Sequence, residues 1–516
     1  MTEPQDNRVH RRDFLARSAA LGVGLAALPA IAEASPGAPP SAPPDVEARS
    51  TDHTELTIAE AATLIRRGRL RPEQLVAAYL DRIATFDGTY QAFNVVRADE
   101  ALAEARAAGR RPSRGALHGI PLAIKDNYFT AGTTTTANSF LFADFVPPFD
   151  ATPVARLKAA GAIVLGKTQM GPLATTRATT PDGRVTTVNA WATSRPEVDP
   201  GGSSTGTATA VAGRLASCGT GTQTGGSITA PSNAQNLTGL KPTMGRVSLH
   251  GIVPLSYTRD HPGPLARDAM DAAIMMSTMA GPDPADPRTL GLPRVPDLVE
   301  AATPVVRRRR VELRWPTRIG VTPGYASTPA RAAFLSALDA LPGASVVEVP
   351  LPAEWELLTG NVFNNVRLPE RSEAFLPQLA TDLRGFGVSV LGWLQGALLG
   401  ANEFVIGQRA KNLLLDRVLS EVFSRCDVVL QTGPVPFDIL GLPEIAFPIG
   451  FSADGLPLGA IFGGKPFGEE RLLSVVSAYQ AVTDWHLRRP ADPSPAAARR
   501  GVEHRLTAED VVETMQ

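Results

Sequence analysis

Short apolar runs alternate with helix-like segments and glycine-rich turns along most of this 516-residue chain. Ile120–Ile124 and Ala162–Leu165 are brief apolar runs bounded by glycine or lysine, a pattern typical of buried strands. Thr57 and Glu60 form a capping box that predicts a helix ending near Gly68. A second helix, poor in charge, is expected over 207–216. Strands and helices that alternate in this way build layered α/β folds.

Two glycine-rich loops carry serine residues, and a lysine follows the first predicted strand. The loops are Gly201–Ser204 and Gly225–Ser227, and the lysine is Lys125. A serine nucleophile needs a base that takes its proton and backbone N–H groups that bind the oxyanion. Glycine leaves such N–H groups accessible because it has no Cβ. Burial can lower the pKa of a lysine until the lysine is a neutral base, so these segments predict serine-based catalysis.

Several separated motifs resemble the hallmark sequences of the amidase signature family, in the family's order, between about Glu55 and Pro490. They are Pro200–Ser204, Gly219–Ser227, Gly239–Thr243, Gly245–Ser248 and Gly281–Pro284. The resemblance implies one large α/β/α domain with a mixed twisted sheet flanked by helices.

The resemblance also implies a role for each candidate site residue. Ser227 is expected to be the nucleophile, Ser203 the bridging serine on a cis peptide bond, and Lys125 the base. The oxyanion is expected to be bound by backbone N–H groups of the nucleophile loop, those of Thr224, Gly225 and Gly226. No cofactor is expected, and no metal site, because the seven histidines are scattered without ligand spacing.

This machinery predicts an exported amidohydrolase that cleaves the C–N bond of a small linear carboxamide, rather than an internal peptide bond, through an acyl-enzyme. An acyltransferase or amide synthase would use the same acyl-enzyme with an amine in place of water. An α/β-hydrolase-like serine esterase would use Ser204 instead, because Gly202–Gly206 also fits a nucleophile elbow. A non-catalytic binding protein on the same scaffold is a further alternative, and a homodimer stays open.

The N-terminal segment has the layout of an export signal. Arg11 and Arg12 precede an apolar stretch, Ala19–Ile31, and an A-x-A cleavage site ends at Ala34. We therefore expect a twin-arginine-type signal peptide over 1–34 and a periplasmic or secreted protein. About 13 apolar residues are too few to span a bilayer. The rest of the chain is expected to divide into three segments. They are a Pro/Ala/Ser-rich linker over 35–54, the amidase signature domain over 55–490 and a tail over 491–516.

Charge and cysteine content limit the partners and the redox chemistry. The net charge of −1 offers no footprint for nucleic acid. Cys218 and Cys426 are the two cysteines of the sequence. Two cysteines make no disulfide framework, so both are expected to be buried free thiols.

Two positions near the predicted nucleophile depart from the family pattern. Gln223 stands where the family usually has Asp, and Thr229 stands where it usually has Arg. Thr229 lacks a guanidinium that could hold an acidic substrate. We therefore expect substrates that are uncharged next to the reacting carbonyl, with Arg246 as the one nearby candidate cation.

Overall fold

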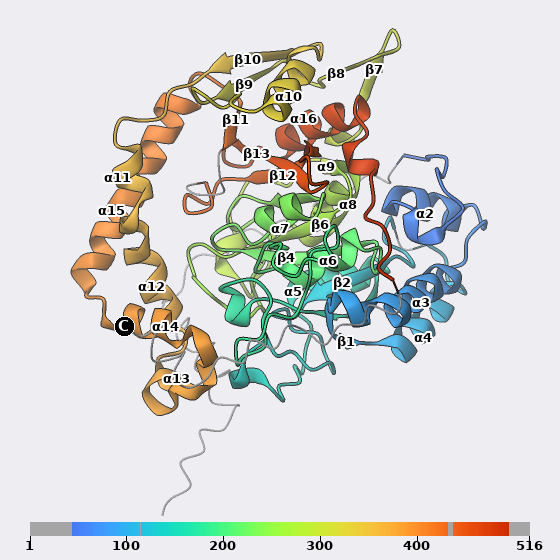
Figure 1. The fold of residues 1–516 in the computed structure, drawn as a ribbon, viewed down its shortest axis with the longest axis horizontal. Coiled ribbons are helices and arrows are strands. Elements are labelled where there is room, and N and C mark those ends of the chain that lie inside the picture. The colour runs from blue at the N-terminus through green and yellow to red at the C-terminus, as the bar shows by residue number, and fades with distance from the viewer. Residues whose placement is uncertain (1–43, 114, 432–436, 495–516) are drawn as a thin grey trace, which may run out of the picture. The chain divides into compact units, whose positions relative to one another are not determined.

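An 11-stranded mixed sheet forms the centre of the computed structural model, which describes residues 44–113, 115–431 and 437–494 (Figure 1). The strand order is β1-β3-β2-β4-β6-β5-β12-β13-β11-β9-β10. Neighbouring strands are parallel within β3-β2-β4 and within β11-β9-β10, and antiparallel in the other pairs. Helices flank the sheet, so the predicted single α/β domain with a mixed sheet is confirmed.

The strands of this sheet are short, and most of them are buried. They are β1 (Phe93–Val96), β2 (Pro121–Lys125), β3 (Ile163–Thr168), β4 (Cys218–Gln223), β5 (Thr238–Lys241), β6 (His261–Ala266), β9 (Thr317–Val321), β10 (Ala344–Glu348), β11 (Val428–Gln431), β12 (Glu444–Phe451) and β13 (Pro457–Gly464). A separate two-stranded ribbon pairs β7 (Val305–Arg307) with β8 (Arg310–Glu312).

The helices fall into those that contact the sheet and those of a later helical region. The first group is α2 (Ile58–Arg66), α3 (Pro72–Tyr90), α4 (Ala98–Ala108), α5 (Thr152–Ala159), α6 (Thr205–Ala212), α7 (Thr229–Ala234), α8 (Ala269–Met279), α9 (Leu298–Ala301), α10 (Pro329–Asp339) and α16 (Glu469–Ala481). The second group, called the helical arm below, is α11 (Trp355–Thr359), α12 (Asn364–Glu373), α13 (Leu376–Thr381), α14 (Val390–Leu398) and α15 (Ala401–Arg417). It is drawn in yellow and orange along one side of Figure 1.

Single turns of tighter or wider helix connect these elements. They are η1 (His53–Glu55), η2 (Phe140–Phe142), η3 (Pro172–Ala174), η4 (Pro287–Thr289), η5 (Asn361–Phe363), η6 (Leu383–Ser389), the π-helical η7 (Val418–Val422) and η8 (Trp485–Leu487).

The local signals in the sequence explain several of these boundaries. Thr57 Oγ1 accepts the N–H of Glu60 while the Glu60 carboxylate accepts the N–H of Thr57, so the predicted capping box opens α2. The predicted helix over 207–216 instead occupies Thr205–Ala212. It ends early because the chain turns at Gly213 and at Arg214, whose φ of 62° is left-handed.

Glycines let β4 lie against the elements that carry the candidate site. A Cβ on Gly219 would lie 2.8 Å from the carbonyl oxygen of Ala123 in β2. A Cβ on Gly221 would lie 2.8 Å from Ser204 Oγ at the start of α6. A side chain at either position would push apart β2, β4 and α6, which hold the site together.

A separate apolar cluster joins the helical arm to the sheet. Leu414 of α15 and Val418 of η7 are buried in it together with Val429 of β11 and with Phe437 and Leu440, which precede β12. This packing fixes α12 and α15 relative to the segment that leads into β12.

The terminal segments lie outside the described residues. These are the predicted signal peptide (1–34), residues 35–43 of the predicted linker (35–54) and most of the predicted tail (491–516). Among the helices that the structure describes, none combines the length and the apolar character needed to cross a bilayer. Cys218 and Cys426 are both buried and unpaired, as predicted.

Candidate active site

Lys125 ends β2, and its side chain is fully buried. Its Nζ lies 2.9 Å from Ser203 Oγ, 3.0 Å from Ser204 Oγ and 2.8 Å from Thr222 Oγ1. Burial holds the pKa of Lys125 well below its usual range, and the negative charge of Asp260 opposes this only in part. The lysine is therefore placed as a neutral amine with hydroxyl groups around it.

Oxygen atoms of Ser203, Ser204 and Thr222 surround this amine. Ser204 Oγ donates to the Thr222 carbonyl over 3.4 Å, so it accepts from Lys125. Thr222 Oγ1 accepts from Asn127 Nδ2 at 3.0 Å and has a second acceptor position for Lys125. Lys125 Nζ also lies 3.3 Å from the Thr222 carbonyl oxygen. An amine surrounded by hydroxyl groups in this way can exchange a proton with Ser203.

Ser203 lies in a turn that requires glycine on its N-terminal side. The Gly202–Ser203 peptide bond is cis, as the family resemblance predicts. A Cβ on Gly202 would lie 2.6 Å from the Thr176 carbonyl oxygen, and Gly201 has a φ of 75°. Ser203 itself is 1% exposed, so it lies enclosed within the site.

Ser227 lies between β4 and α7 and is half-buried, in contrast to the enclosed Lys125 and Ser203. Its carbonyl oxygen accepts the N–H of Ser204 at 3.3 Å, which joins the two serine loops. Within the described part of the chain its hydroxyl makes no hydrogen bond. Ser227 is thus the serine of the site that a substrate can reach.

The loop that ends at Ser227 presents unpaired N–H groups. Among the described residues, the backbone N–H groups of Thr224, Gly225, Gly226 and Ser227 donate no hydrogen bond. The Thr224 carbonyl is occupied by Arg259 Nη2 at 2.6 Å, and the Thr224 hydroxyl donates to Asp260. Gly226 has a φ of 112°, a conformation that favours glycine. A run of free N–H groups beside a reachable hydroxyl can bind an oxyanion.

The two residues that depart from the family pattern contact each other. Gln223 Oε1 accepts the backbone N–H groups of Ile228 and Thr229, both at 2.9 Å, and the Thr229 hydroxyl at 3.2 Å. All these groups are fully buried. Gln223 therefore supplies a neutral acceptor to the turn that follows the nucleophile, and Thr229 donates to that acceptor without adding a charge.

A cation that the sequence analysis missed lies beside the nucleophile loop. Arg259 Nη2 pairs with Asp438 Oδ2 at 2.9 Å, and it would lie 3.9 Å from a Cβ on Gly225. Both charged side chains are nearly inaccessible, at 4% and 0% exposed. The adjacent charges Arg259 and Asp260, directly before a strand of low polarity, were the signal in the sequence that could have identified this site.

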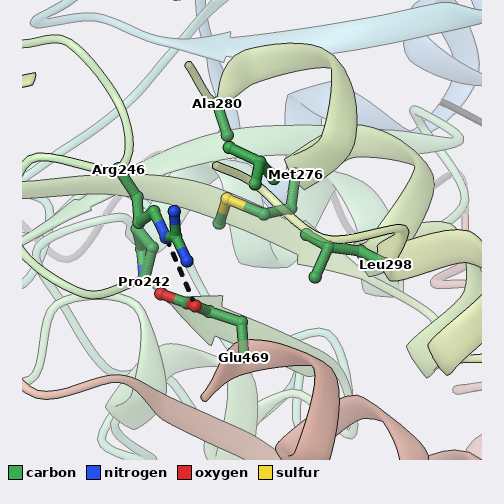
Figure 2. Close-up of a pocket in the computed structure, with 7 residues that line it drawn as sticks. Pro242, Arg246, Met276, Ala280, Leu298 and Glu469 are labelled. Atoms are coloured by element: carbon green, nitrogen blue, oxygen red, sulfur yellow. Dashed lines mark ion pairs between the residues drawn. The ribbon is translucent and has the colours of Figure 1, made fainter. Parts of the chain in front are cut away.

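Arg246, the cation expected to approach the substrate, is engaged elsewhere. Its Nε lies 3.5 Å from Glu469 Oε2, and its guanidinium stacks on Phe467. Figure 2 shows Arg246 pointing at Glu469 in a small apolar pocket lined by Met276 and Leu298. Arg246, the nearby candidate cation of the sequence, is thus paired with Glu469.

Arg367 and Lys411 of the helical arm lie near Arg259 and Asp438, and Arg371 lies near Arg367. Arg367 and Arg371 lie in α12, and Lys411 lies in α15. Burial lowers the pKa of Arg371 to about 10, and it also lowers the pKa values of Arg367 and Lys411. The arm thus brings positive charge into a region that is largely shielded from water.

One carboxylate ties the arm to the loop that carries Arg259. Glu370 of α12 accepts from the Ser256 hydroxyl at 2.6 Å, and from the Thr258 N–H and hydroxyl at 3.0 and 2.8 Å. The Thr258 carbonyl accepts from Lys411 Nζ at 3.3 Å. These contacts place α12 and α15 directly over the residues that precede β6.

Ser204 does not fit the nucleophile elbow. Its side chain is fully buried, and its hydroxyl lies between Lys125 and Thr222. The residues before it, 195–200, form turns rather than the strand that an elbow must follow. The esterase alternative was therefore wrong.

Comparisons with known proteins agree with this geometry. The chain is 36% identical over 490 residues to one of the subunits of the glutamyl-tRNA(Gln) amidotransferase of Chloroflexus aggregans, a match that covers 84% of this chain and 98% of that protein. The peptide amidase PAM, solved in complex with the competitive inhibitor chymostatin, aligns with a TM-score of 0.72 and 28% identity over 85% of this chain and 99% of that one. The corresponding glutamyl-tRNA(Gln) amidotransferase protein of Thermotoga maritima aligns with a TM-score of 0.68 and 25% identity over 87% of this chain and 100% of that one.

The curated relatives correct the predicted function and location. They are named as subunits of an amidotransferase for glutamyl-tRNA(Gln), and charged tRNA is a substrate used inside cells. This contradicts the prediction of an exported amidohydrolase, and with it the predicted twin-arginine export to the periplasm or medium.

The shared reaction class follows from the family. A family model described as Amidase matches residues 74–377, which is more than half of the chain. Together with relatives above 30% identity over most of both sequences, this makes the protein an amide-hydrolysing or amidotransferase enzyme. The chain belongs to the amidase signature family.

Proposed function

We propose that this protein cleaves the C–N bond of a linear carboxamide by forming an acyl-enzyme at Ser227. One observation carries the proposal. The neutral, enclosed amine of Lys125 lies 2.9 Å from Ser203, and the Ser203 loop is bonded to the reachable Ser227 loop with its free N–H groups.

The proton and the electron pairs move as follows. Ser227 Oγ attacks the carbonyl carbon while its proton passes to Ser203, and the Ser203 proton passes to Lys125. The carbonyl oxygen becomes an oxyanion held by N–H groups of 224–227. When the tetrahedral intermediate collapses, the C–N bond breaks and Lys125 returns the proton through Ser203 to the leaving nitrogen. Water or another acceptor then takes the acyl group from Ser227.

The enclosure of Ser203 favours a small leaving group. The leaving nitrogen must approach Ser203 to be protonated, and Ser203 is 1% exposed. A long chain on the nitrogen side would have to enter this enclosed space. We therefore propose a terminal carboxamide or a small N-substituted amide as the substrate, rather than an internal peptide bond.

A serine-directed covalent probe tests this proposal directly. A fluorophosphonate should label the purified protein once per chain, on the peptide that contains Ser227, and the labelled protein should release no ammonia from a panel of primary amides. Labelling of the peptide that contains Ser204 would contradict the proposal. Unchanged ammonia release after complete labelling would also contradict it.

A second role, transfer of the released nitrogen within a complex, is favoured by one observation. Curated relatives covered over 98% of their length are named as one subunit of an amidotransferase. Light scattering on the protein purified from its native host should then show further chains in fixed ratio. A chain that runs alone with full amide-cleaving activity would contradict this second role.

The charges around Arg259 bear on the substrate class. Three cations, Arg259, Arg367 and Lys411, lie near the two carboxylates Asp438 and Glu370 in this region. Buried cations in excess of carboxylates favour an anion in their midst. The expectation of an uncharged substrate assumed that no cation was fixed near the loop, and Arg259 contradicts that assumption. We therefore propose a carboxamide that carries an anionic group.

Substrate preference is expected to follow this charge. A carboxylate-bearing amide should show a kcat/KM about 10- to 100-fold above that of its neutral isostere, since a charge-assisted hydrogen bond contributes roughly 1.5–3 kcal/mol. Arg367→Met should remove most of that preference. Arg384→Met, on the same arm but 90% exposed, is the control and should keep it. Equal kcat/KM values for acid and isostere in the wild type would contradict the anionic substrate.

A further inference from the structure

We propose that Gln223 is a positioning residue for Ser227, and that Glu444 holds Gln223 in place from the opposite part of the sheet. The proposal rests on the proposed function, since it concerns the serine that forms the acyl-enzyme. It assigns a role in the rate to two residues that touch neither the substrate nor the reacting atoms.

Gln223 contacts the turn that directly follows Ser227. Its Oε1 accepts two consecutive N–H groups, of Ile228 and Thr229, at 2.9 Å each. These residues directly follow Ser227 and begin α7. Because one oxygen atom binds both N–H groups, any rotation of the Gln223 side chain moves the backbone that carries Ser227.

Glu444 fixes the orientation of the Gln223 amide. Gln223 Nε2 donates to Glu444 Oε2 at 2.7 Å, and Gln431 Nε2 donates to Glu444 Oε1 at 3.0 Å. Lys241 Nζ lies 3.9 Å from the same carboxyl group. Gln223, Glu444 and Lys241 are all fully inaccessible to water. A flipped amide would point its NH₂ at the two N–H groups and its oxygen at the carboxyl, so the carboxyl selects the orientation seen here.

The position of Ser227 acts on the transition state more than on substrate binding. The Ser227 hydroxyl must meet the carbonyl carbon while N–H groups of the same loop meet the oxyanion. A loosened turn misplaces both at once. The expected effect of losing Gln223 is therefore a lower kcat with a KM that changes little.

The test compares Gln223→Met, Gln223→Glu and the exchange variant Gln223→Glu/Glu444→Gln in the full-length protein. Gln223→Met removes the hydrogen bonds at similar side-chain length and should lower kcat about 10- to 100-fold. This loss is smaller than the largest losses in kcat that follow removal of an oxyanion-hole donor. Gln223→Glu keeps the acceptor but places it against the Glu444 carboxyl, and should also lower kcat. The exchange variant restores a donor facing a carboxyl and should recover kcat to within about 3-fold of wild type.

Gln480→Glu is the matched control. Gln480 is also buried, its Oε1 accepts the N–H of Ala269, and its Nε2 donates to Thr238 Oγ1. The change should lower thermal stability without lowering the kcat of the folded protein. Each kcat is referred to the fraction of folded chains, measured by circular dichroism at the assay temperature, so a loss of folded protein is not read as a loss of rate.

Two outcomes overturn the inference. The first is a Gln223→Met variant with wild-type kcat, and the second is an exchange variant no faster than Gln223→Glu. A parallel Ser227→Ala variant separates these outcomes from a failure of the proposed function. If Ser227→Ala is inactive while Gln223→Met is unimpaired, only the positioning role is lost; if Ser227→Ala is fully active, the proposed function itself fails.

Discussion

Replacing Ser227 with alanine is expected to lower kcat by at least about 10⁴-fold, as the loss of a serine nucleophile does in other serine hydrolases. The reason is that no other described hydroxyl combines access to the substrate with a bond to the Ser203 loop. Ser203 and Ser204 are buried, and Ser227 is the half-buried member of the group. Ammonia release from a preferred amide, measured at saturating substrate on folded protein, gives the value.

Ser204→Ala provides the contrast for this experiment. It removes one hydrogen-bond partner of Lys125 and leaves the Ser203 contact in place, so a loss of about tenfold is expected. Near-normal turnover in Ser227→Ala combined with complete loss in Ser204→Ala would reverse the assignment of the nucleophile.

Replacing Lys125 with methionine is expected to lower kcat/KM by about 10²- to 10⁴-fold, the range that general base catalysis contributes. In the wild type, kcat/KM should rise with pH through the pKa of Lys125. The neutral amine is the active form, and burial lowers this pKa, so the rise lies well below the usual range of lysine. A pH series of kcat/KM on the free enzyme measures it.

A histidine variant is the control for the lysine base. His250 stacks on Phe149, and none of its hydrogen bonds is to a site residue. His250→Ala should therefore keep both the rate and the rising limb. A folded His250→Ala protein that has lost the limb would show that a histidine, and not Lys125, sets the pH dependence.

Features of the site that depend on residues close together in the sequence could be predicted from the sequence. The apolar run before Lys125 indicates a buried strand, and β2 has all five residues buried. The glycines before Ser203 and Ser227 indicate tight turns, and Gly201 and Gly226 both have a positive φ. Local residue types and spacing determine such features, so a single sequence contains them.

The parts that depend on distant segments could not be predicted in the same way. Gln223 and Glu444 are 221 positions apart, and their contact depends on the order of strands in the sheet. The same holds for Arg259 and Asp438, so the sequence led to Arg246 instead. The predicted export is contradicted by the curated relatives, which are named as subunits of an amidotransferase for glutamyl-tRNA(Gln).

The proposed catalytic trio and the cations near Arg259 come from different stretches of the chain. Lys125, Ser203 and Ser227 all lie between β2 and α7, whereas most of the charged groups facing Arg259 lie in α12, in α15 and just before β12. Substitutions in α12, in α15 or just before β12 can change which amide is accepted. Lys125, Ser203 and Ser227, which are proposed to cleave the amide, then stay as they are. A lineage built on this plan can acquire new substrates over evolutionary time without first losing its chemistry, and an engineer can randomise the arm while leaving the nucleophile untouched.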